Sequence, residues 1–380
     1  ACPGSVTDNE TCTEPGAHHF VTATAALPVH VDRDRTLRVK IIDACGMTCT
    51  FCHNEGTPVT ADNLGREAGS FAGSGRTGRV SIYTATNGAS FLPAPVLPDT
   101  DFHDALVALR QALDVTELHL TGGEPTLHTG LPRLVALARD AGYSVRMTSN
   151  GERGAEQMDR CAKAGLERIN FSVFGTTPDE LAAVQHERYR HPARATRKLD
   201  ALKSSIDAAV AAGIGVNANL VVPDTSHIPR VHRLLDEYSP RLSVRLLNSL
   251  DHGEASIQAI EQVLAERGAV PEARYLTAGV SGSRTAYRLP DGRRVFFKQI
   301  RRVRLPTTCA GCRFNNDTDC QEGFYGVRLY RDRRGDYQVG VCIQRMDLCR
   351  PLDDFLHSGL PEEIRQLRQQ EHDQLTTSSR

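Results

Sequence analysis

Three cysteines near the start of the chain are the residues whose type and spacing most clearly predict chemistry. Cys45, Cys49 and Cys52 follow the pattern C-x3-C-x2-C on one short stretch. Three neighbouring thiolates can bind three irons of a [4Fe–4S] cluster and leave the fourth iron open to a ligand, whereas ordinary electron-transfer clusters use four cysteines. A zinc site completed by His53 is the structural alternative, although structural zinc favours two separated pairs of ligands. A third reading is that the thiols are close only by chance.

A second group of cysteines lies near the C-terminus. Cys309, Cys312, Cys320 and Cys342 are spaced C-x2-C-x7-C-x21-C, and Cys349 follows as a fifth thiol. The C-x2-C pair can chelate one metal or cluster, so we expect a second [4Fe–4S] cluster, with a zinc ribbon as the alternative. The spacing leaves open which of the last three thiols complete the site. The other cysteines are expected to be plain thiols: Cys2, Cys12 and Cys161.

Composition narrows the class of protein. The formal net charge is −1, so no basic field points to a nucleic-acid partner. The chain contains no apolar run of about 18 residues and no visible signal peptide, so we expect no membrane partner and a cytoplasmic location. In that compartment the 11 cysteines stay reduced and are available for metal binding.

The elements that position these residues form a repeating pattern. A β-branched run over 37–43 leads directly into the first cysteines, and strands and helices alternate over 101–250, with a further short strand expected over 80–83. About six β/α units predict an α/β fold, a partial (β/α)6 TIM-like barrel with a small C-terminal cysteine-rich auxiliary domain. A doubly wound sheet has the same element order. The expected domains are an N-terminal arm (1–36), the barrel (37–255), and an auxiliary iron–sulfur domain with a helical tail (256–380).

Small and polar residues end the predicted strands. In parallel β/α folds the C-terminal strand ends carry the site, so these side chains should converge on one mouth. Two adjacent glycines also let backbone approach a ligand closely. The candidate cofactor-binding residues are Gly122, Gly123, Glu124, Pro125, Ser149, Asn150, Ser172, Asn219 and Arg245.

The first cysteine motif, with Phe51 before its last cysteine, resembles the signature of the radical S-adenosylmethionine (SAM) superfamily. The resemblance implies that Cys45, Cys49 and Cys52 hold the cluster, that SAM chelates the open iron, and that its reductive cleavage gives a 5′-deoxyadenosyl radical. Gly122-Gly-Glu-Pro resembles the family's SAM-binding motif, and the other strand-end residues match positions that contact SAM. Membership also implies an electron donor such as flavodoxin or ferredoxin.

The C-terminal cysteine region resembles that of the GTP cyclases of molybdenum-cofactor synthesis. In those proteins a twitch or SPASM-like domain holds an auxiliary cluster across the barrel mouth. Those cyclases use three cysteines spaced C-x2-C-x13-C, whereas this chain offers four or five. The departure puts in doubt whether a second cluster would keep an iron open for substrate.

The sequence says less about the substrate. Lys298 and Arg302 would share one face of a strand and suit a small anionic substrate, and Asn54 and Glu55, just after the cluster, are placed to contact SAM or substrate. The stretch 45–58 resembles that of cytosylglucuronate decarboxylases of blasticidin-type nucleoside antibiotic synthesis. This resemblance implies hydrogen abstraction from a sugar nucleoside uronate and redox-neutral loss of CO2, a lyase reaction.

Two other functions stay open. A maturase of ribosomal peptides is one, although the 36 residues before the first predicted strand are few for a leader-binding domain. A non-enzymatic zinc or iron–sulfur binding module is the other. Gly122-Gly-Glu-Pro argues against the second, because a metal scaffold needs no SAM pocket.

Overall fold

The computed structural model describes residues 27–59, 62, 79, 81–83 and 87–379 of the chain. Cys2 and Cys12 lie outside these residues, as does most of the predicted N-terminal arm. The strand expected over 80–83 is wrong for its described part, because residues 81–83 adopt no strand. No helix in the described ranges is both long and apolar enough to cross a membrane.

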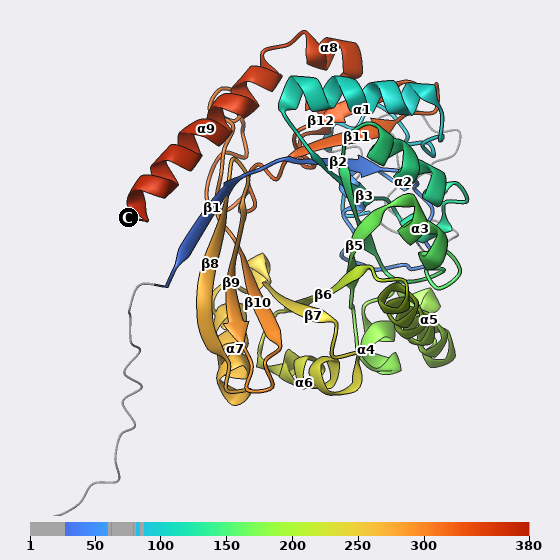
Figure 1. The fold of residues 1–380 in the computed structure, drawn as a ribbon, viewed down its shortest axis with the longest axis vertical. Coiled ribbons are helices and arrows are strands. Elements are labelled where there is room, and N and C mark those ends of the chain that lie inside the picture. The colour runs from blue at the N-terminus through green and yellow to red at the C-terminus, as the bar shows by residue number, and fades with distance from the viewer. Residues whose placement is uncertain (1–26, 60–61, 63–78, 80, 84–86, 380) are drawn as a thin grey trace, which may run out of the picture.

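Six parallel strands form the centre of the sheet, and the predicted partial barrel is confirmed. They are β2 (Thr36–Lys40), β3 (Glu117–Thr121), β4 (Ser144–Ser149), β5 (Leu166–Ser172), β6 (Gly215–Val222) and β7 (Ser243–Asn248). Helices connect them on the outside (Figure 1). These are α1 (Thr100–Leu113), α2 (Leu131–Asp140), α3 (Met158–Ala164), α4 (Pro178–Ala183), α5 (Pro192–Ala211) and α6 (Ile228–Glu237).

Helix α1 illustrates why the connections are helical. The Asp99 side chain caps the helix by accepting the Phe102 N–H at 3.0 Å. Apolar residues then recur every three or four positions, which places them on the face toward the sheet. The buried ones are Phe102, Ala105, Leu106, Leu109 and Leu113.

The remaining strands extend this sheet at both edges. After α7 (Glu254–Glu266), the strands β8 (Val270–Ala278), β9 (Gly282–Arg288) and β10 (Arg294–Ile300) form an antiparallel meander, and β10 pairs in parallel with β7. The strands β11 (Val327–Arg331), β12 (Tyr337–Gly340) and β13 (Arg350–Pro351) extend the β2 edge. The C-terminal third therefore flanks the barrel on two sides.

Strand β1 (Val29–Arg33) pairs with β8, at the far end of the strand order from β2. Only residues 34 and 35 separate β1 from β2, so the sheet must curve until its two distant parts meet (Figure 1). The first strand was expected only after residue 36, so β1 was not predicted. Three of its five residues are exposed, so the strand has no apolar run by which it could be recognised in the sequence.

The helical C-terminal tail is confirmed as α8 (Leu352–Leu356) and α9 (Leu360–Ser378). Helix α9 packs on the outside of β1 and β8. Its buried Arg368 donates to Asp34 Oδ2 at 3.0 Å and to the Leu113 carbonyl at 2.6 Å. The tail thus fixes the link between β1 and β2 and belongs to the barrel wall.

Candidate active site

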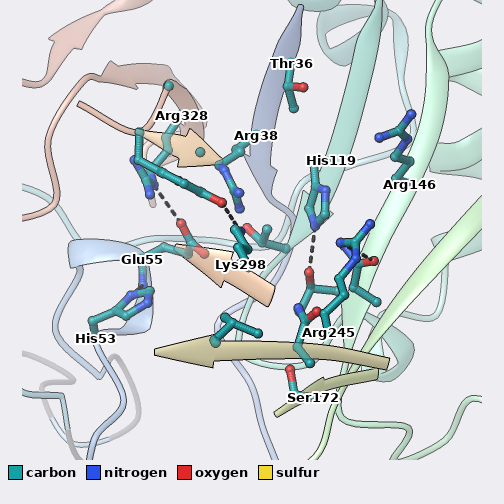
Figure 2. Close-up of a pocket in the computed structure, with 18 of the residues that line it drawn as sticks. Thr36, Arg38, His53, Glu55, His119, Arg146, Ser172, Arg245, Lys298 and Arg328 are labelled. Carbon is teal, nitrogen blue, oxygen red and sulfur yellow. Dashed lines mark hydrogen bonds and ion pairs between the residues drawn. The ribbon is translucent and has the colours of Figure 1, made fainter. Parts of the chain in front are cut away.

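A cavity of about 860 Å³ lies inside the curved sheet. It is lined by the cysteine loop after β2 and by the C-terminal ends of the parallel strands. Polar side chains from the middle and the N-terminal parts of the same strands also line it. Figure 2 shows side chains from separate strands converging on this space. We call the part near the cysteine loop the cofactor end and the part lined by the arginines described below the cationic end.

Cys45, Cys49 and Cys52 all line the cofactor end. The sulfur of Cys45 accepts the Met47 N–H at 3.4 Å, and that of Cys49 accepts the Gln185 side-chain amide at 3.3 Å. Such N–H to sulfur contacts stabilise thiolates bound to iron. Burial raises the pKa of the Cys49 thiol to about 12, so deprotonation calls for a positively charged ligand. The loop therefore fits a [4Fe–4S] cluster.

The described residues contain no group of three or more His, Cys, Asp or Glu side chains arranged around a position for a single metal ion. Cysteines that hold a cube bind separate irons and stand farther apart than the ligands of one ion. Gln185, which also accepts the Thr48 N–H at 2.7 Å, lies more than 130 residues from the loop in sequence and was not predicted.

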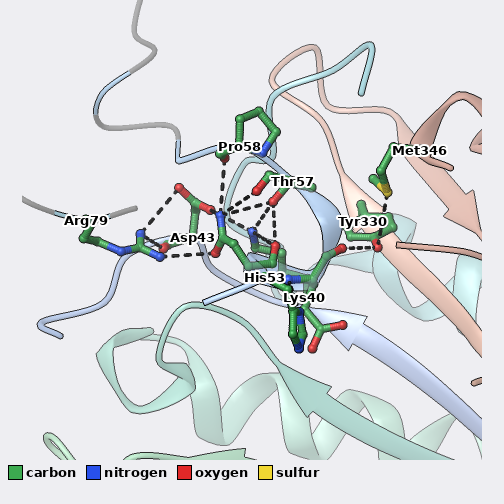
Figure 3. A network of polar contacts seen from close by, with 10 residues as sticks. Lys40, Asp43, His53, Thr57, Pro58, Arg79, Tyr330 and Met346 are labelled. Atoms are coloured by element: carbon green, nitrogen blue, oxygen red, sulfur yellow. Dashed lines mark hydrogen bonds and ion pairs between the residues drawn. The ribbon is translucent and has the colours of Figure 1, made fainter. Parts of the chain in front are cut away.

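A buried polar network ties the two ends of the cysteine loop together (Figure 3). Lys40 donates to Asp43 at 2.7 Å, and the Asn54 amide donates to Asp43 at 3.0 Å and to the Thr57 carbonyl at 3.1 Å. Arg79 donates to Asn54 Oδ1 at 3.2 Å. Asn54 was predicted to contact SAM or substrate. It lines the cavity, but its amide holds the loop closed.

The Gly122-Gly123 pair packs against the cysteine loop. A Cβ at Gly123 would stand 2.3 Å from the Ala44 carbonyl oxygen, and one at Gly122 would stand 2.6 Å from the Ile42 carbonyl oxygen. The backbone N–H of Gly123 donates to Ile42 at 2.7 Å. The glycines line the cavity, and a close backbone approach does require them, but the observed neighbour is the chain itself.

Glu124 joins two of the predicted motifs. Its carboxylate accepts hydrogen bonds from the Thr126 hydroxyl at 2.7 Å, the Ser149 hydroxyl at 2.6 Å and the Asn150 N–H at 2.7 Å. The Asn150 amide in turn donates to Cys45 Sγ at 3.5 Å. Burial raises the pKa of Glu124, against these hydrogen bonds. Pro125, also predicted, does not line the cavity; it begins the 3-10 turn Pro125–Leu127.

Ser172, Asn219 and Arg245 line the same cavity from β5, β6 and β7. Asn219 Oδ1 and Arg245 Nε are buried without a hydrogen-bond partner in the described structure. The Arg245 guanidinium makes one contact, to Asn170 Oδ1, at 3.2 Å. Buried polar atoms left unpaired are costly, which indicates that a ligand completes them.

Four arginines gather at the cationic end, and only Arg245 was predicted. We call them the arginine quartet: Arg146, Arg168, Arg245 and Arg284. Only Arg146 forms an ion pair with a carboxylate of the described residues, with Glu117 at 3.1 Å. Burial, and then the nearby charges of Arg284 and Arg168, lower the pKa of Arg245 to about 10. The quartet therefore contains like charges that repel one another.

Register explains how two members of the quartet, Arg146 and Arg168, come to face the same space. Arg38, His119, Arg146 and Arg168 are successive pairing partners across β2, β3, β4 and β5. Residues at one level of a sheet face the same side, so four basic side chains line the barrel interior. Burial, and then Arg38, lower the pKa of His119 well below its ordinary value, so this ring stays neutral.

The other predicted substrate residues divide into two groups. Glu55 and Lys298 line the cavity, whereas Arg302 does not. Strand β10 ends at Ile300, so Arg302 no longer shares the face of Lys298 and pairs instead with Asp317. The expectation for Arg302 is therefore wrong.

Glu55 forms a buried ion pair with Arg328 at 2.8 Å, and Figure 2 shows the two on the opposite side of the cavity from Arg146. Burial raises the pKa of Glu55, but the charges of Arg328 and then His53 and Arg38 outweigh it, and the pKa falls to about 2. The carboxylate is fixed in its ionised form.

The second set of cysteines also comes together. Burial raises the pKa of Cys309, and the neighbouring thiols of Cys342, Cys312 and Cys320 raise it further. Arg345 lies 3.6 Å from Cys312 Sγ and would complement the charge of a thiolate-bound group. Cys349 also lies near Cys342, and it packs in a small apolar cluster with Ala89, Phe91, Tyr330 and Met346.

Comparison with known proteins adds the family. The model of the radical SAM superfamily matches residues 39–236, more than half of the chain. A protein named "Probable GTP 3',8-cyclase" of Aeropyrum pernix is 27% identical over 79% of this chain and 72% of its own length. A GTP 3',8-cyclase of Klebsiella pneumoniae is 28% identical over 58% of this chain, which spans 56% of that protein.

Among solved structures, SuiB of Streptococcus suis bound to S-adenosylmethionine covers 88% of this chain and 68% of its own, with 14% identity and a TM-score of 0.46. The family match runs from the end of β2 through β6 and includes the cysteine loop and the Gly122-Gly123 pair. The chain belongs to the radical SAM superfamily, an enzyme family that uses a [4Fe–4S] cluster and S-adenosylmethionine.

Proposed function

We propose that Cys45, Cys49 and Cys52 hold the [4Fe–4S] cluster of this enzyme and that SAM binds beside it in the cofactor end of the cavity. When bound, the cluster supplies the electron that cleaves SAM to a 5′-deoxyadenosyl radical. Ser172 and Asn219 line the cavity, and Asn219 Oδ1 has no hydrogen-bond partner in the described structure, which supports a role in holding SAM. Asn150 and Gln185 orient the thiols.

The radical would abstract hydrogen from a small anionic substrate held at the cationic end. The observation that carries this assignment is the arginine quartet, three of whose members have no carboxylate partner in the described structure. Guanidinium groups bind carboxylates and phosphates through paired N–H donors. This position reassigns Arg245 from SAM to the substrate, because the charges that act most strongly on it are those of other arginines.

A sugar nucleoside uronate that undergoes decarboxylation is the first candidate substrate. Its carboxylate suits the arginine quartet, and it agrees with the resemblance of residues 45–58 to cytosylglucuronate decarboxylases. The net reaction replaces the carboxylate by hydrogen and releases CO2, with uptake of one proton and no net oxidant. GTP is the second candidate, because relatives bearing the name GTP 3',8-cyclase are 27% and 28% identical to this chain and a triphosphate would also satisfy several arginines.

The C-terminal cysteines would hold a second [4Fe–4S] cluster through Cys309, Cys312, Cys320 and Cys342. Their mutual proximity supports this set. Cys349 also lies near Cys342, but its packing in an apolar cluster supports its exclusion. Four cysteine ligands would leave no iron open, so this cluster would transfer electrons rather than bind substrate. A flavodoxin or ferredoxin is the proposed external donor.

The test is anaerobic turnover of the reconstituted enzyme with SAM and dithionite. Cytosylglucuronate and GTP are supplied separately, and 5′-deoxyadenosine and product are followed by mass spectrometry. Substrate-dependent 5′-deoxyadenosine with loss of CO2 from the uronate supports the first candidate. Conversion of GTP alone supports the second. Absence of 5′-deoxyadenosine under every condition would contradict the assignment of the cluster.

A further inference from the structure

Tyr325 presents a phenol to the cavity between two cations from different strands. It lies in the segment between Cys320 and β11 and lines the cavity. Lys298, from β10, donates a hydrogen bond to its hydroxyl, as Figure 2 shows by a dashed line at the labelled lysine. The Arg38 guanidinium, from β2, lies 4.6 Å from the ring centroid. The ring is therefore fixed from two sides, with its hydroxyl beside an ammonium group.

The charges around the hydroxyl favour loss of its proton. Lys298, Arg38 and Arg245 face Tyr325 from β10, β2 and β7, and Glu322 faces it from its own segment. Burial raises the pKa of Tyr325, but Lys298 and Arg38 outweigh it, and the pKa falls to about 8. A group that titrates so close to neutral pH is suited to proton transfer.

We propose that Tyr325 is a catalytic acid that supplies the proton for the new C–H bond of the product, and Lys298 is the positioning residue that stabilises the phenolate. This inference rests on the proposed function. Loss of CO2 leaves the electron pair of the broken C–C bond on the substrate. The carbon radical takes one electron from a one-electron iron–sulfur or flavin donor and one proton from water, which together replace the abstracted hydrogen, and the carbon that carried the carboxylate takes its proton from the Tyr325 hydroxyl. The O–H bond breaks, the C–H bond forms, and the phenolate then regains a proton from water.

The first test needs no substrate. The ultraviolet absorbance of tyrosinate is titrated in wild type and in Tyr325→Phe, and the difference reports Tyr325 alone. A midpoint at about 8 is expected, moving upward in Lys298→Met because the stabilising cation is lost. A midpoint near the ordinary value of about 10, unmoved by Lys298→Met, would overturn the proposal.

The second test is turnover of cytosylglucuronate in D2O by the enzyme with its clusters reconstituted. Tyr325→Phe should form 5′-deoxyadenosine within about threefold of wild type, because hydrogen abstraction precedes the step. Decarboxylated product per 5′-deoxyadenosine should fall about hundredfold, at the low end for a general acid. The wild-type product should carry deuterium from solvent. Tyr287→Phe, which removes a hydroxyl outside the cavity, is the control and should match wild type.

Wild-type product without solvent deuterium would contradict the proposed net reaction, which takes up a proton. An unchanged product ratio in Tyr325→Phe would overturn the role of Tyr325 and leave the proposed function intact. Failure of wild type to form 5′-deoxyadenosine with this substrate would instead count against the proposed function. The pH profile gives a further readout. Because the acid must be protonated, product formation should decline as pH rises through about 8, and in Lys298→Met the decline should move to higher pH.

Discussion

The two ends of the cavity are built in opposite ways. At the cofactor end the charged side chains find partners within the protein: Glu124 accepts hydrogen bonds from Thr126, Ser149 and Asn150, and Lys40 pairs with Asp43. At the cationic end, Arg168, Arg245 and Arg284 have no carboxylate partner among the described residues. At one end the charged side chains are paired within the protein, and the other keeps like charges together.

The difference separates a scaffold from a binding surface. A complete network fixes the geometry of a loop that must hold a cofactor in one position. Repelling guanidinium groups reduce the stability of the empty protein, and such a cost is typical of a site that a ligand completes. The cofactor end should therefore respond to mutation through loss of assembly, and the cationic end through loss of substrate affinity.

The largest effect is expected at the cysteine loop. Cys45→Ala should abolish SAM cleavage and leave the fold largely intact, because the thiol makes only weak hydrogen bonds within the protein. The measurement is 5′-deoxyadenosine formation, with circular dichroism as the check on folding. In the triple variant of Cys45, Cys49 and Cys52, iron should fall from about eight to about four atoms per chain. Retained cleavage in Cys45→Ala would show that the cluster is held elsewhere.

The buried pair of Glu55 and Arg328 should dominate acid stability. The folded pKa of Glu55 is about 2 against an ordinary 4.5, so its contribution is complete above 4.5 and is lost as pH falls toward 2. The shift corresponds to about 3 kcal/mol. Urea unfolding at decreasing pH measures it, and Glu55→Gln should remove this part of the pH dependence. Glu167→Gln, in an exposed ion pair, is the matched control and should leave the pH dependence unchanged.

Removing an arginine of the quartet should raise the stability of the substrate-free protein and lower its affinity for substrate. Arg168→Met removes one of the repelling charges, so the substrate-free protein should become more stable by about 0.5 kcal/mol, while KM rises about tenfold. Arg146→Met is the contrast, because it leaves Glu117 without its partner and should lower both stability and affinity. Thermal unfolding and steady-state kinetics measure the two effects. A substrate-free Arg168→Met that is less stable than wild type would mean that the quartet is not repulsive.

The smallest effect is expected at Cys349. Cys349→Ala removes a thiol from a small apolar cluster and should cost about 1 kcal/mol, with iron content unchanged. Cys342→Ala is the matched variant and should lose the irons of the second cluster. Iron analysis distinguishes the two variants. Loss of iron in Cys349→Ala would show that Cys349 is a ligand of the second cluster.

Much of the cofactor end was predictable from local sequence. Cys45, Cys49 and Cys52 are close in the chain, so their spacing alone brings them to one loop, and the alternation of strands and helices indicated the barrel that carries it. The Gly122-Gly123 pair was predicted because glycine lets the backbone approach a ligand closely. In the structure the backbone at these glycines approaches the cysteine loop itself.

The cationic end was decided by tertiary structure. The quartet comes from β4, β5, β7 and β9, and each arginine taken alone is an ordinary polar residue of its strand. Arg302 was misplaced for the converse reason: alternation along a strand holds only while the strand continues, and β10 stops at Ile300.

The sequence by itself determined the features that depend on neighbours in the chain: the first cysteine motif, the β/α order, and through them the family. Only the tertiary structure decided the contacts between distant segments. Gln185 reaches Cys49 across 136 positions, and Lys298 reaches Tyr325 from a different strand. These contacts depend on register and on the curvature that joins β1 to β2, which are properties of the whole sheet and leave no local signal in the sequence.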